Sequence, residues 1–411
     1  MNKTTCITID VAQDKSQIQG FIGPNKPLCR SRVLRHTKQG FQLICQLIDL
    51  VKSKSGINDQ PLIIFEFTGI YHKTLEKFLI SHHYLYHIVS PLRAAKARKK
   101  EMRDQKTDSR DCLSLSKMFY ADELGDFYSE DPKYANLRKL NRFYNTNMKH
   151  LVKIKVNFKE TLAIIYPHYT SVFDNAYSNE SLTFLKLFPH PDIFLSYSKE
   201  DIIKILCDKW NHKEEWIVSK VSELYDYVSN IISGCYPDDV DASILLSYIS
   251  QIDYYSNLID ATITQMTNMT RSLPLYNFVY SLPGIKENLT SRFIAELGDI
   301  NRFTNYKQMI AYTGTDPIID QSGGDDGLHK KISKKGNKHL RTILNLMVKS
   351  MIRANREDNV IRDKYRKWTQ QASPLLPGVA SIACANQLLK IIFYMYLTGS
   401  VYKYKPLNSP K

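Results

Sequence analysis

The order of short apolar runs near the start of the chain limits most strictly what it can fold into. Residues 4–11, 17–22 and 29–34 show the alternating or apolar pattern of strands, and a Gly-Pro-Asn turn signal separates the last two. Apolar residues at helical spacing follow, so we expect a helix that begins after Thr37 and stops at Gly56. The chain therefore begins with three strands and a helix.

A strand of the buried kind comes next. Residues 62–67 are almost entirely apolar, as in strands that are covered on both faces. We expect a helix over 71–81, a strand over 84–90 and then helical, strongly basic sequence. This order fits a mixed sheet with helices on its faces, as in ribonuclease-H-like domains. A doubly wound sheet is the alternative, although the glycine-rich phosphate loop expected after its first strand is missing.

Two long stretches with apolar residues at heptad spacing predict that the rest of the chain is helical. They cover 132–166 and 245–266, and they suggest a coiled-coil arm that is folded back on itself or shared between subunits. The region between them, 167–241, is irregular and aromatic-rich, with short helices whose bounds the pattern does not give. The fold class expected is thus α/β plus all-α. The expected domains cover 1–125, 126–271 and 272–411.

The chain carries a strong positive charge. Its 411 residues include 56 Lys and Arg against 41 Asp and Glu, a formal net charge of +15. Such a surplus indicates a polyanionic partner, either nucleic acid or an anionic membrane surface. Seven cysteines without a Cys-X-X-Cys pair argue against a disulfide scaffold or zinc finger. With no signal-peptide pattern, and with the apolar run 388–397 too short to span a bilayer, we expect a cytoplasmic protein without a membrane partner.

Four carboxylates occupy positions that suit a metal site. Asp10 ends the first strand, and Glu66 lies at the end of the buried strand, where a carboxylate is costly unless it is compensated. Asp108 and Asp111 are three residues apart, so both face one way on a helix. Oxygen ligands suit Mg²⁺, and two such ions can bind the attacking and leaving oxygens of a phosphoryl transfer. Each acid alone could be structural, as a turn former or helix cap, but together they favour a site for two Mg²⁺ ions.

Three basic segments predict a nucleic-acid-binding surface. A solvated helix face is the alternative for any single segment. In the stretch 133–159, however, no acid is present to neutralise the bases, and a phosphate backbone is their natural counterion. A membrane-surface helix fits less well, because no segment pairs this charge with a face rich in Trp, Phe and Leu. The expected nucleic-acid-binding bases are Arg93, Lys96, Arg98, Lys99, Lys100, Arg103, Lys106, Arg138, Lys139, Arg142, Lys149, Lys153, Lys330, Lys331, Lys334, Lys335, Lys338 and Arg341.

Two glycine-containing segments near the C-terminus suggest further contacts with phosphate. The Pro-Gly turn at 280–285 precedes an expected helix at 288–297, as in a helix-hairpin-helix, and Gly284 would let the backbone approach phosphates. Such turns between helices are common, so this signal is weak alone. Ser322 lies in a Gln-Ser-Gly-Gly run next to the last basic segment. It could be a nucleophile, a phosphate ligand or part of a polar turn.

Short motifs at both ends of the chain follow the order found in a known family. They lie at 9–11, 66–71, 106–111, 282–285, 302–303, 312–314, 321–323, 332–337 and 340–341. In these motifs the chain resembles the insertion-sequence transposases with a DEDD catalytic motif and a RuvC-like N-terminal domain. That group is related to the Piv DNA invertase and includes bridge-RNA-guided recombinases. The region 167–241 matches little of it.

The resemblance implies roles for five residues. It implies that Asp10, Glu66, Asp108 and Asp111 bind Mg²⁺ and that Ser322 attacks a DNA phosphodiester to form a covalent phosphoserine intermediate. Serine is a weak nucleophile at its free pKa and needs a base or a metal to activate it.

The resemblance also implies partners. The basic segments would bind double-stranded donor and target DNA together with a guide (bridge) RNA. A homo-oligomer, a dimer or tetramer, is expected because recombination handles several strands. Cys112 stands where the family usually has a small residue such as alanine. Two alternatives stay open: a structure-specific nuclease or junction resolvase that does not need Ser322, and a non-catalytic nucleic-acid-binding protein.

Overall fold

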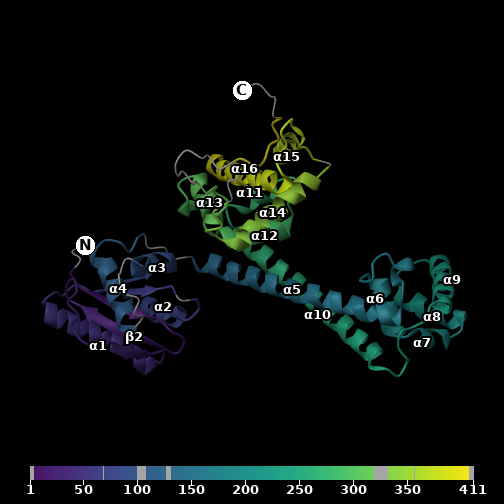
Figure 1. Cartoon of the computed structure of the whole chain (residues 1–411), viewed down its shortest axis with the longest axis horizontal. Coiled ribbons are helices and arrows are strands. Elements are labelled where there is room, and N and C mark those ends of the chain that lie inside the picture. The colour runs from purple at the N-terminus through teal and green to yellow at the C-terminus, as the bar shows by residue number, and fades with distance from the viewer. Residues whose placement is uncertain are drawn as a thin grey trace. The chain divides into compact units, whose positions relative to one another are not determined.

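Two compact units make up the chain: a sheet unit, Met1–Ser129, and a helical unit, Glu130–Lys411 (Figure 1). The computed structural model describes residues 4–67, 69–99, 108–125, 131–318, 332–355 and 357–406, without the side chains of Leu92, Arg98, Lys99, Asp108, Ser109 and Arg110. The expected boundary between 271 and 272 falls inside the helical unit. The division into three domains stays a prediction.

A five-stranded mixed sheet of order β3-β2-β1-β4-β5 forms the centre of the sheet unit. Its strands are β1 (Cys6–Asp10), β2 (Lys15–Phe21), β3 (Arg32–Arg35), β4 (Leu62–Glu66) and β5 (Tyr86–Val89). The β1–β2 and β2–β3 pairs are antiparallel, and the β1–β4 and β4–β5 pairs are parallel. All five expected strands are present, with β3 a few residues later than expected. The carboxyl ends of β1 and β4 therefore lie side by side.

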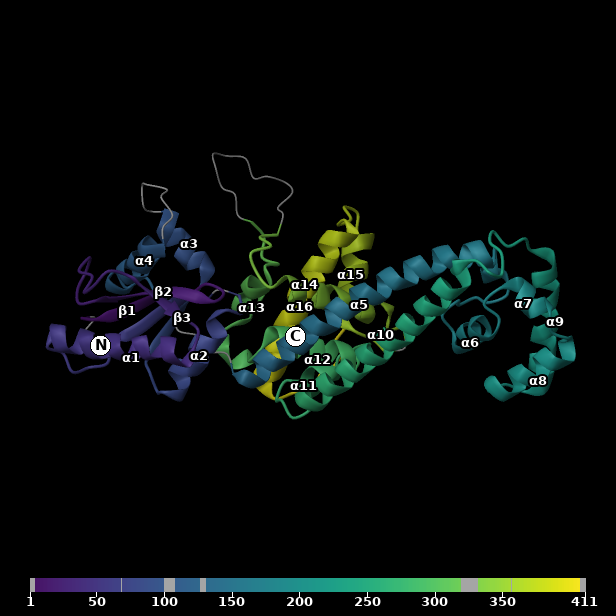
Figure 2. The ribbon, with the colours of Figure 1, turned by 90° about the horizontal axis from the view of Figure 1, so that it is seen from below.

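Helices cover both faces of this sheet (Figure 2). One face packs on α1 (Lys38–Ser55) and α2 (His72–Ser81), and the other on α3 (Pro91–Lys99) and α4 (Asp108–Tyr120). The α1 helix begins and ends where the sequence predicts. Thr37 accepts a hydrogen bond from the Gly40 amide, and Gly56 ends the helix with a φ of 71°.

Two long helices, α5 (Pro132–Ile165) and α10 (Val240–Thr270), pack against each other in the helical unit (Figure 1). They run antiparallel, because the His150 ring contacts that of Tyr255, and the Gly234 amide, just before α10, bonds to the Ile164 carbonyl near the end of α5. The expected heptad helices thus lie together within one chain.

The region 167–241 is largely helical, and the structure gives bounds to the short helices that the sequence pattern could not place. It contains η1 (Tyr169–Ser171), α6 (Asn179–Leu187), α7 (Pro191–Leu195), α8 (Lys199–Lys209) and α9 (Glu214–Asn230). Aromatic rings fill its core: Phe184 is fully buried against Tyr166, Phe188 and Phe194. Apart from α9, these helices have 11 residues or fewer and show few apolar repeats, which hides their period in the sequence.

A second helical core lies at the C-terminal end of the unit. It is made of α11 (Tyr276–Tyr280), α12 (Glu287–Leu297), η2 (Ile300–Arg302), α13 (Tyr306–Thr313), α14 (Lys338–Arg353), α15 (Val360–Gln370) and α16 (Pro377–Thr398). Among the described residues, α16 alone is long and apolar enough to cross a membrane by length and composition. This helix is longer than the apolar run 388–397 that the sequence singled out. Its Leu388, Leu389 and Ile392 side chains are fully buried in this core. Core helices of this kind pass the same test.

Candidate catalytic and nucleic-acid-binding sites

Asp10 and Glu66 end two neighbouring parallel strands. Ile9 is opposite Phe65 in the β1–β4 register, so the two carboxylates follow at equivalent positions. Side chains alternate between the faces of a strand, and Cys6 and Ile64 face α4. Asp10 and Glu66, an even number of residues further on, therefore lie on that same face. Both residues are half-buried.

The α4 helix is fixed to this face by Thr8 and Cys112. The Thr8 hydroxyl donates a 2.9 Å hydrogen bond to the Cys112 carbonyl, and the Cys112 thiol contacts the carbonyls of Thr8 and Gln17. Burial, with a smaller contribution from the negative charges of Asp10 and Asp111, raises the pKa of the Cys112 thiol to about 12. Both carboxylates therefore lie close enough to Cys112 to act on it. A small residue is needed there because the site is fully buried.

Three of the four expected metal ligands thus lie on the α4 side of the sheet. Asp108 begins α4 one turn before Asp111, and its side chain is outside the described residues. Among the side chains that are described, no group of three or more His, Cys, Asp or Glu could hold a metal ion. The metal-binding tetrad stays a prediction.

The basic segment of the sheet unit is described only at its start. Arg93 and Lys96 are exposed on α3. The Arg93 guanidinium lies over Gly125, 2.0 Å from where a Cβ of that glycine would be. Outside the described residues lie Lys100, Arg103 and Lys106, together with the side chains of Arg98 and Lys99.

A buried carboxylate lies within reach of two bases of α5. Glu296 of α12 is fully buried, and its oxygens lie 3.8 Å from Nε of Arg138 and 3.9 Å from Nε of Arg142. It also accepts 2.8 Å hydrogen bonds from the amide groups of Asn141 and Asn337. The absence of acids from residues 133–159 therefore does not leave Arg138 and Arg142 without a counterion. Their role in binding nucleic acid stays a prediction.

A cationic groove lies between α5 and α14. Its cavity, of about 550 Å³, is lined by Asn145, Met148, Lys149, Val152, Arg292, Lys338, His339 and Thr342. Burial lowers the pKa of His339, and the positive charges of Arg142, Lys338 and Lys149 lower it further, although Glu296 opposes them. Lys139 and Lys153 are also exposed on α5. The structure thus brings bases of two expected segments together.

The structure requires glycine at position 284 for a reason that differs from the expected one. Its φ is 72°, and a Cβ would lie 2.9 Å from the carbonyl oxygen of Ser350 on α14. The helix after the turn, α12, is buried over residues 290–297. The glycine is needed for close packing on α14, and a phosphate contact by its backbone stays a prediction.

The segment that carries Ser322 begins and ends at a short paired neck. Pro317 and Ile332 form an antiparallel bridge, and the Ser333 hydroxyl donates a 2.7 Å hydrogen bond to the Asp316 carboxylate. Ser322, Lys330 and Lys331 lie outside the described residues. The remaining bases, Lys334, Lys335 and Arg341, are described, and Arg341 donates to the Thr313 carbonyl over 2.8 Å.

The sequence reasoning missed Glu296 and its link to this neck. Asn337 caps α14, where its side-chain oxygen accepts from the amides of His339 and Leu340, while its Nδ2 donates to Glu296. Beside them, the Arg302 guanidinium lies over the ring of Tyr312 at 4.1 Å. The signal was present, because Glu296 stands among apolar residues just as Glu66 does.

Two family models match the chain. A model of IS110-type DEDD transposases, described as a transposase, matches residues 7–167, which include the sheet, α4 and α5. A model described as the Transposase IS116/IS110/IS902 family matches residues 276–366, from α11 into α15. No curated protein matches the chain. The two models together cover more than half of the sequence, and the chain belongs to the IS110 family of DEDD transposases, which makes it a DNA transposase and recombinase.

Proposed function

We propose that this transposase cuts and rejoins DNA strands through a covalent intermediate on Ser322, with Mg²⁺ held by Asp10, Glu66, Asp108 and Asp111. The observation that carries the proposal is the position of Asp10 and Glu66 at adjacent parallel strand ends, on the face that α4 covers with Asp111. The sheet order, with two antiparallel and two parallel pairs, supports a ribonuclease-H-like (RuvC-like) fold for this unit.

The donor set fits Mg²⁺. All four residues offer carboxylate oxygens, which hard divalent cations prefer, and three of them gather on one side of the sheet. Two ions are expected, and when bound they would compensate the charge that develops on the transferred phosphoryl group. The Thr8–Cys112 hydrogen bond holds the start of α4 against β1 and thereby positions Asp111.

The serine step exchanges one phosphate ester bond for another. The Ser322 oxygen forms a bond to phosphorus while one bond from phosphorus to a deoxyribose oxygen breaks. The serine proton leaves to a base, and the departing deoxyribose oxygen takes up a proton. A strand hydroxyl can reverse the step on the phosphoserine, so rejoining needs no external energy source. Serine requires activation for this attack.

The partners proposed are donor and target DNA, a guide (bridge) RNA and further copies of the chain. The charge of +15 and the groove between α5 and α14 support polyanion binding. Guidance by RNA rests on the family resemblance. Assembly as a dimer or tetramer follows from the several strands that recombination must hold, and we place the protein in the prokaryotic cytoplasm.

A covalent trapping assay tests this function. Full-length protein is incubated with Mg²⁺, labelled donor and target DNA, and RNA transcribed from the flanks of the gene, and is then run on a denaturing gel. We expect a slowly migrating protein–DNA band that needs both the RNA and Mg²⁺. Ser322→Ala and Asp10→Asn should abolish it. The exposed residues Ser373 and Asp59 supply matched controls, S373A and D59N, that should keep it.

Three results would contradict parts of the proposal. Cleavage that persists in Ser322→Ala without a covalent band would make the protein a metal-dependent nuclease. An unchanged band in Asp10→Asn would exclude the acidic site from the reaction. A band that forms equally well without RNA would exclude guidance.

A further inference from the structure

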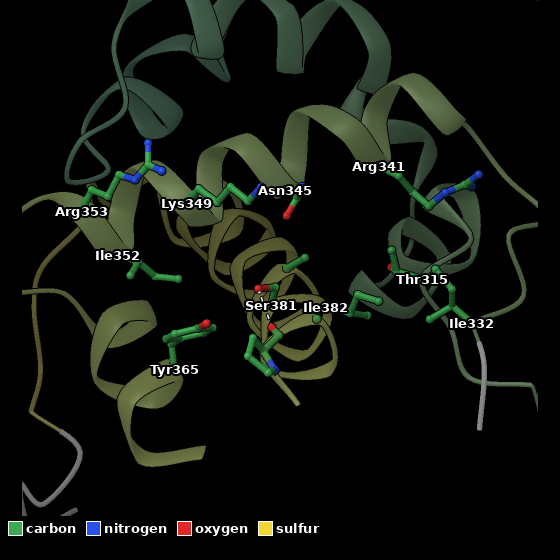
Figure 3. Close-up of a pocket in the computed structure, with 13 residues that line it drawn as sticks. Thr315, Ile332, Arg341, Asn345, Lys349, Ile352, Arg353, Tyr365, Ser381 and Ile382 are labelled. Atoms are coloured by element: carbon green, nitrogen blue, oxygen red, sulfur yellow. Dashed lines mark hydrogen bonds between the residues drawn. The ribbon is translucent and has the colours of Figure 1, made fainter. Parts of the chain in front are cut away.

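A second cavity, of about 560 Å³, lies beside the neck of the serine-bearing segment (Figure 3). Residues of α14, α15 and α16 line most of it. The remaining wall comes from Thr315 and Ile332, which flank the serine-bearing segment on its two sides. The size falls in the range of sites that enclose a small molecule or one monomer of a polymer.

The charged groups of this cavity are cations on one face of α14. Arg341, Lys349 and Arg353 recur at helical spacing, with Asn345 between the first two. Figure 3 shows Arg341 and Arg353 at opposite ends of the cavity, with Lys349 and Asn345 between them. The lining includes no acid, and no described carboxylate forms an ion pair with Lys349 or Arg353. An anionic occupant would therefore meet uncompensated positive charge.

The other walls are apolar and aromatic. Tyr365 of α15 and Ile352 lie on one side, Ile332 on the other, and Ser381 and Ile382 of α16 between them (Figure 3). Aromatic side chains bind nucleotide bases by stacking, and this binding tolerates any base. An apolar space with one ring and cations along one wall matches the chemistry of one nucleotide, a flat base joined to phosphates.

We propose that this cavity holds one unstacked nucleotide of the DNA strand that Ser322 cuts, with its base against Tyr365 and its phosphates near Lys349 and Arg353. The inference rests on the proposed function. The choice of the cut strand follows from the neck, because Ile332 both lines the cavity and forms the Pro317–Ile332 bridge from which the serine-bearing segment starts and returns. Lifting a nucleotide out of the stack would present the neighbouring phosphodiester to the serine.

Photo-cross-linking tests the occupant. Full-length protein and its RNA are bound to donor and target DNA that carries 5-iododeoxyuridine at one position at a time around the mapped cut. After irradiation, the linked peptide is identified by mass spectrometry. We expect a cross-link at Tyr365 from one position next to each cut. A cross-link at Tyr365 from 5-iodouridine in the RNA, and not from DNA, would overturn the choice of strand.

Binding measurements with an abasic nucleotide test the stacking. Removing the base at the cross-linked position should weaken binding to wild type about tenfold. Tyr365→Leu should weaken binding of intact DNA by a similar factor. Combining this variant with the abasic DNA should weaken binding no more than either change does alone. Tyr365→Phe should behave as wild type, since the ring is kept. The matched control is the half-exposed Tyr394, which lies outside the cavity and whose Y394L variant should bind normally.

The cations are tested by salt dependence. Lys349→Gln should weaken binding and reduce the slope of log affinity against log salt by about one, whereas the exposed Lys367 on α15 can be replaced (K367Q) without this change in slope. If base removal and Tyr365→Leu had additive effects on binding, and no cross-link formed at Tyr365, the proposal that a nucleotide occupies this cavity would be wrong. This would hold even if the covalent protein–DNA band forms. A cross-link at Tyr365 without any covalent band would contradict the serine intermediate but would leave the proposed occupant of the cavity in place.

Discussion

Asn337 donates a 2.8 Å hydrogen bond from its side-chain amide to Oε2 of the fully buried Glu296. This contact joins the first turn of α14 to α12, and Glu296 in turn lies beside Arg138 and Arg142 of α5. A carboxylate so deeply buried is stable only while its donors are present. The start of α14, which follows the neck of the serine-bearing segment by a few residues, and the long helix α5 are therefore held by one shared carboxylate.

Glu296→Gln should destabilise the helical unit. The change keeps the shape of the side chain but removes the charge near Arg138 and Arg142, and it replaces one acceptor oxygen with a donor next to Asn141 or Asn337. We expect a loss of about 1–3 kcal/mol in the free energy of unfolding, measured by chemical denaturation. The control is Glu287→Gln, whose exposed pair with Arg271 should contribute less than about 1 kcal/mol. Equal effects of the two changes would refute the role of Glu296.

How much the sequence predicts differs between the two acidic centres. Asp10 and Glu66 could be placed because strand alternation and parallel order are local patterns, and parallel strands bring their carboxyl ends to one edge. The apolar neighbours of Glu296 mark it as buried, but its partners could not be predicted, because Asn141 and Arg138 are on α5, far away in the sequence. A tertiary counterion leaves no periodic signal.

The strands and helices also differ in how far the sequence predicts them. The strands and α1 could be predicted because Thr37 and Gly56 mark the helix ends and the apolar runs have a clear period. The helices of 167–241 could not be placed, since all but α9 are short and their core is made of rings such as Phe184 and Phe194, which follow no helical period. The hydrogen bond between Thr8 and Cys112 could not be predicted either, because it depends on how α4 packs on the sheet.

Gly284→Ala separates a packing role from a phosphate contact. The φ of 72° is strained for alanine, and the added Cβ would lie 2.9 Å from the Ser350 carbonyl oxygen, so stability should fall by more than about 1 kcal/mol. Gly378→Ala, which meets nothing within 4 Å, should be neutral or slightly stabilising. Thermal unfolding measures both. If Gly284→Ala left stability unchanged but weakened DNA binding, the packing explanation would fail.

Stability of the sheet unit should fall between about pH 9 and pH 12. Burial raises the pKa of Cys6 and of Cys112 from 9.0 to about 12. In the unfolded chain these thiols lose their protons above about pH 9, whereas in the folded chain they keep them, so their contribution is present below pH 9 and is lost as pH rises toward 12. Unfolding measured across this window should depend less steeply on pH in Cys112→Ala than in wild type. The partly exposed Cys29 supplies the control, C29A, which should keep the wild-type slope.

Lys149→Gln and Lys338→Gln should each weaken nucleic-acid binding without affecting the fold. Both residues are exposed and line the groove between α5 and α14, so each should lower affinity for all sequences alike and reduce the salt slope by about one. The control is Lys204→Gln on α8, an exposed lysine that does not line this groove and should leave the slope unchanged. Arg138→Gln should differ from all three, because Arg138 is largely buried beside Glu296 and its loss should lower stability. A salt slope that stays at the wild-type value in both groove variants would show that nucleic acid binds elsewhere on the chain.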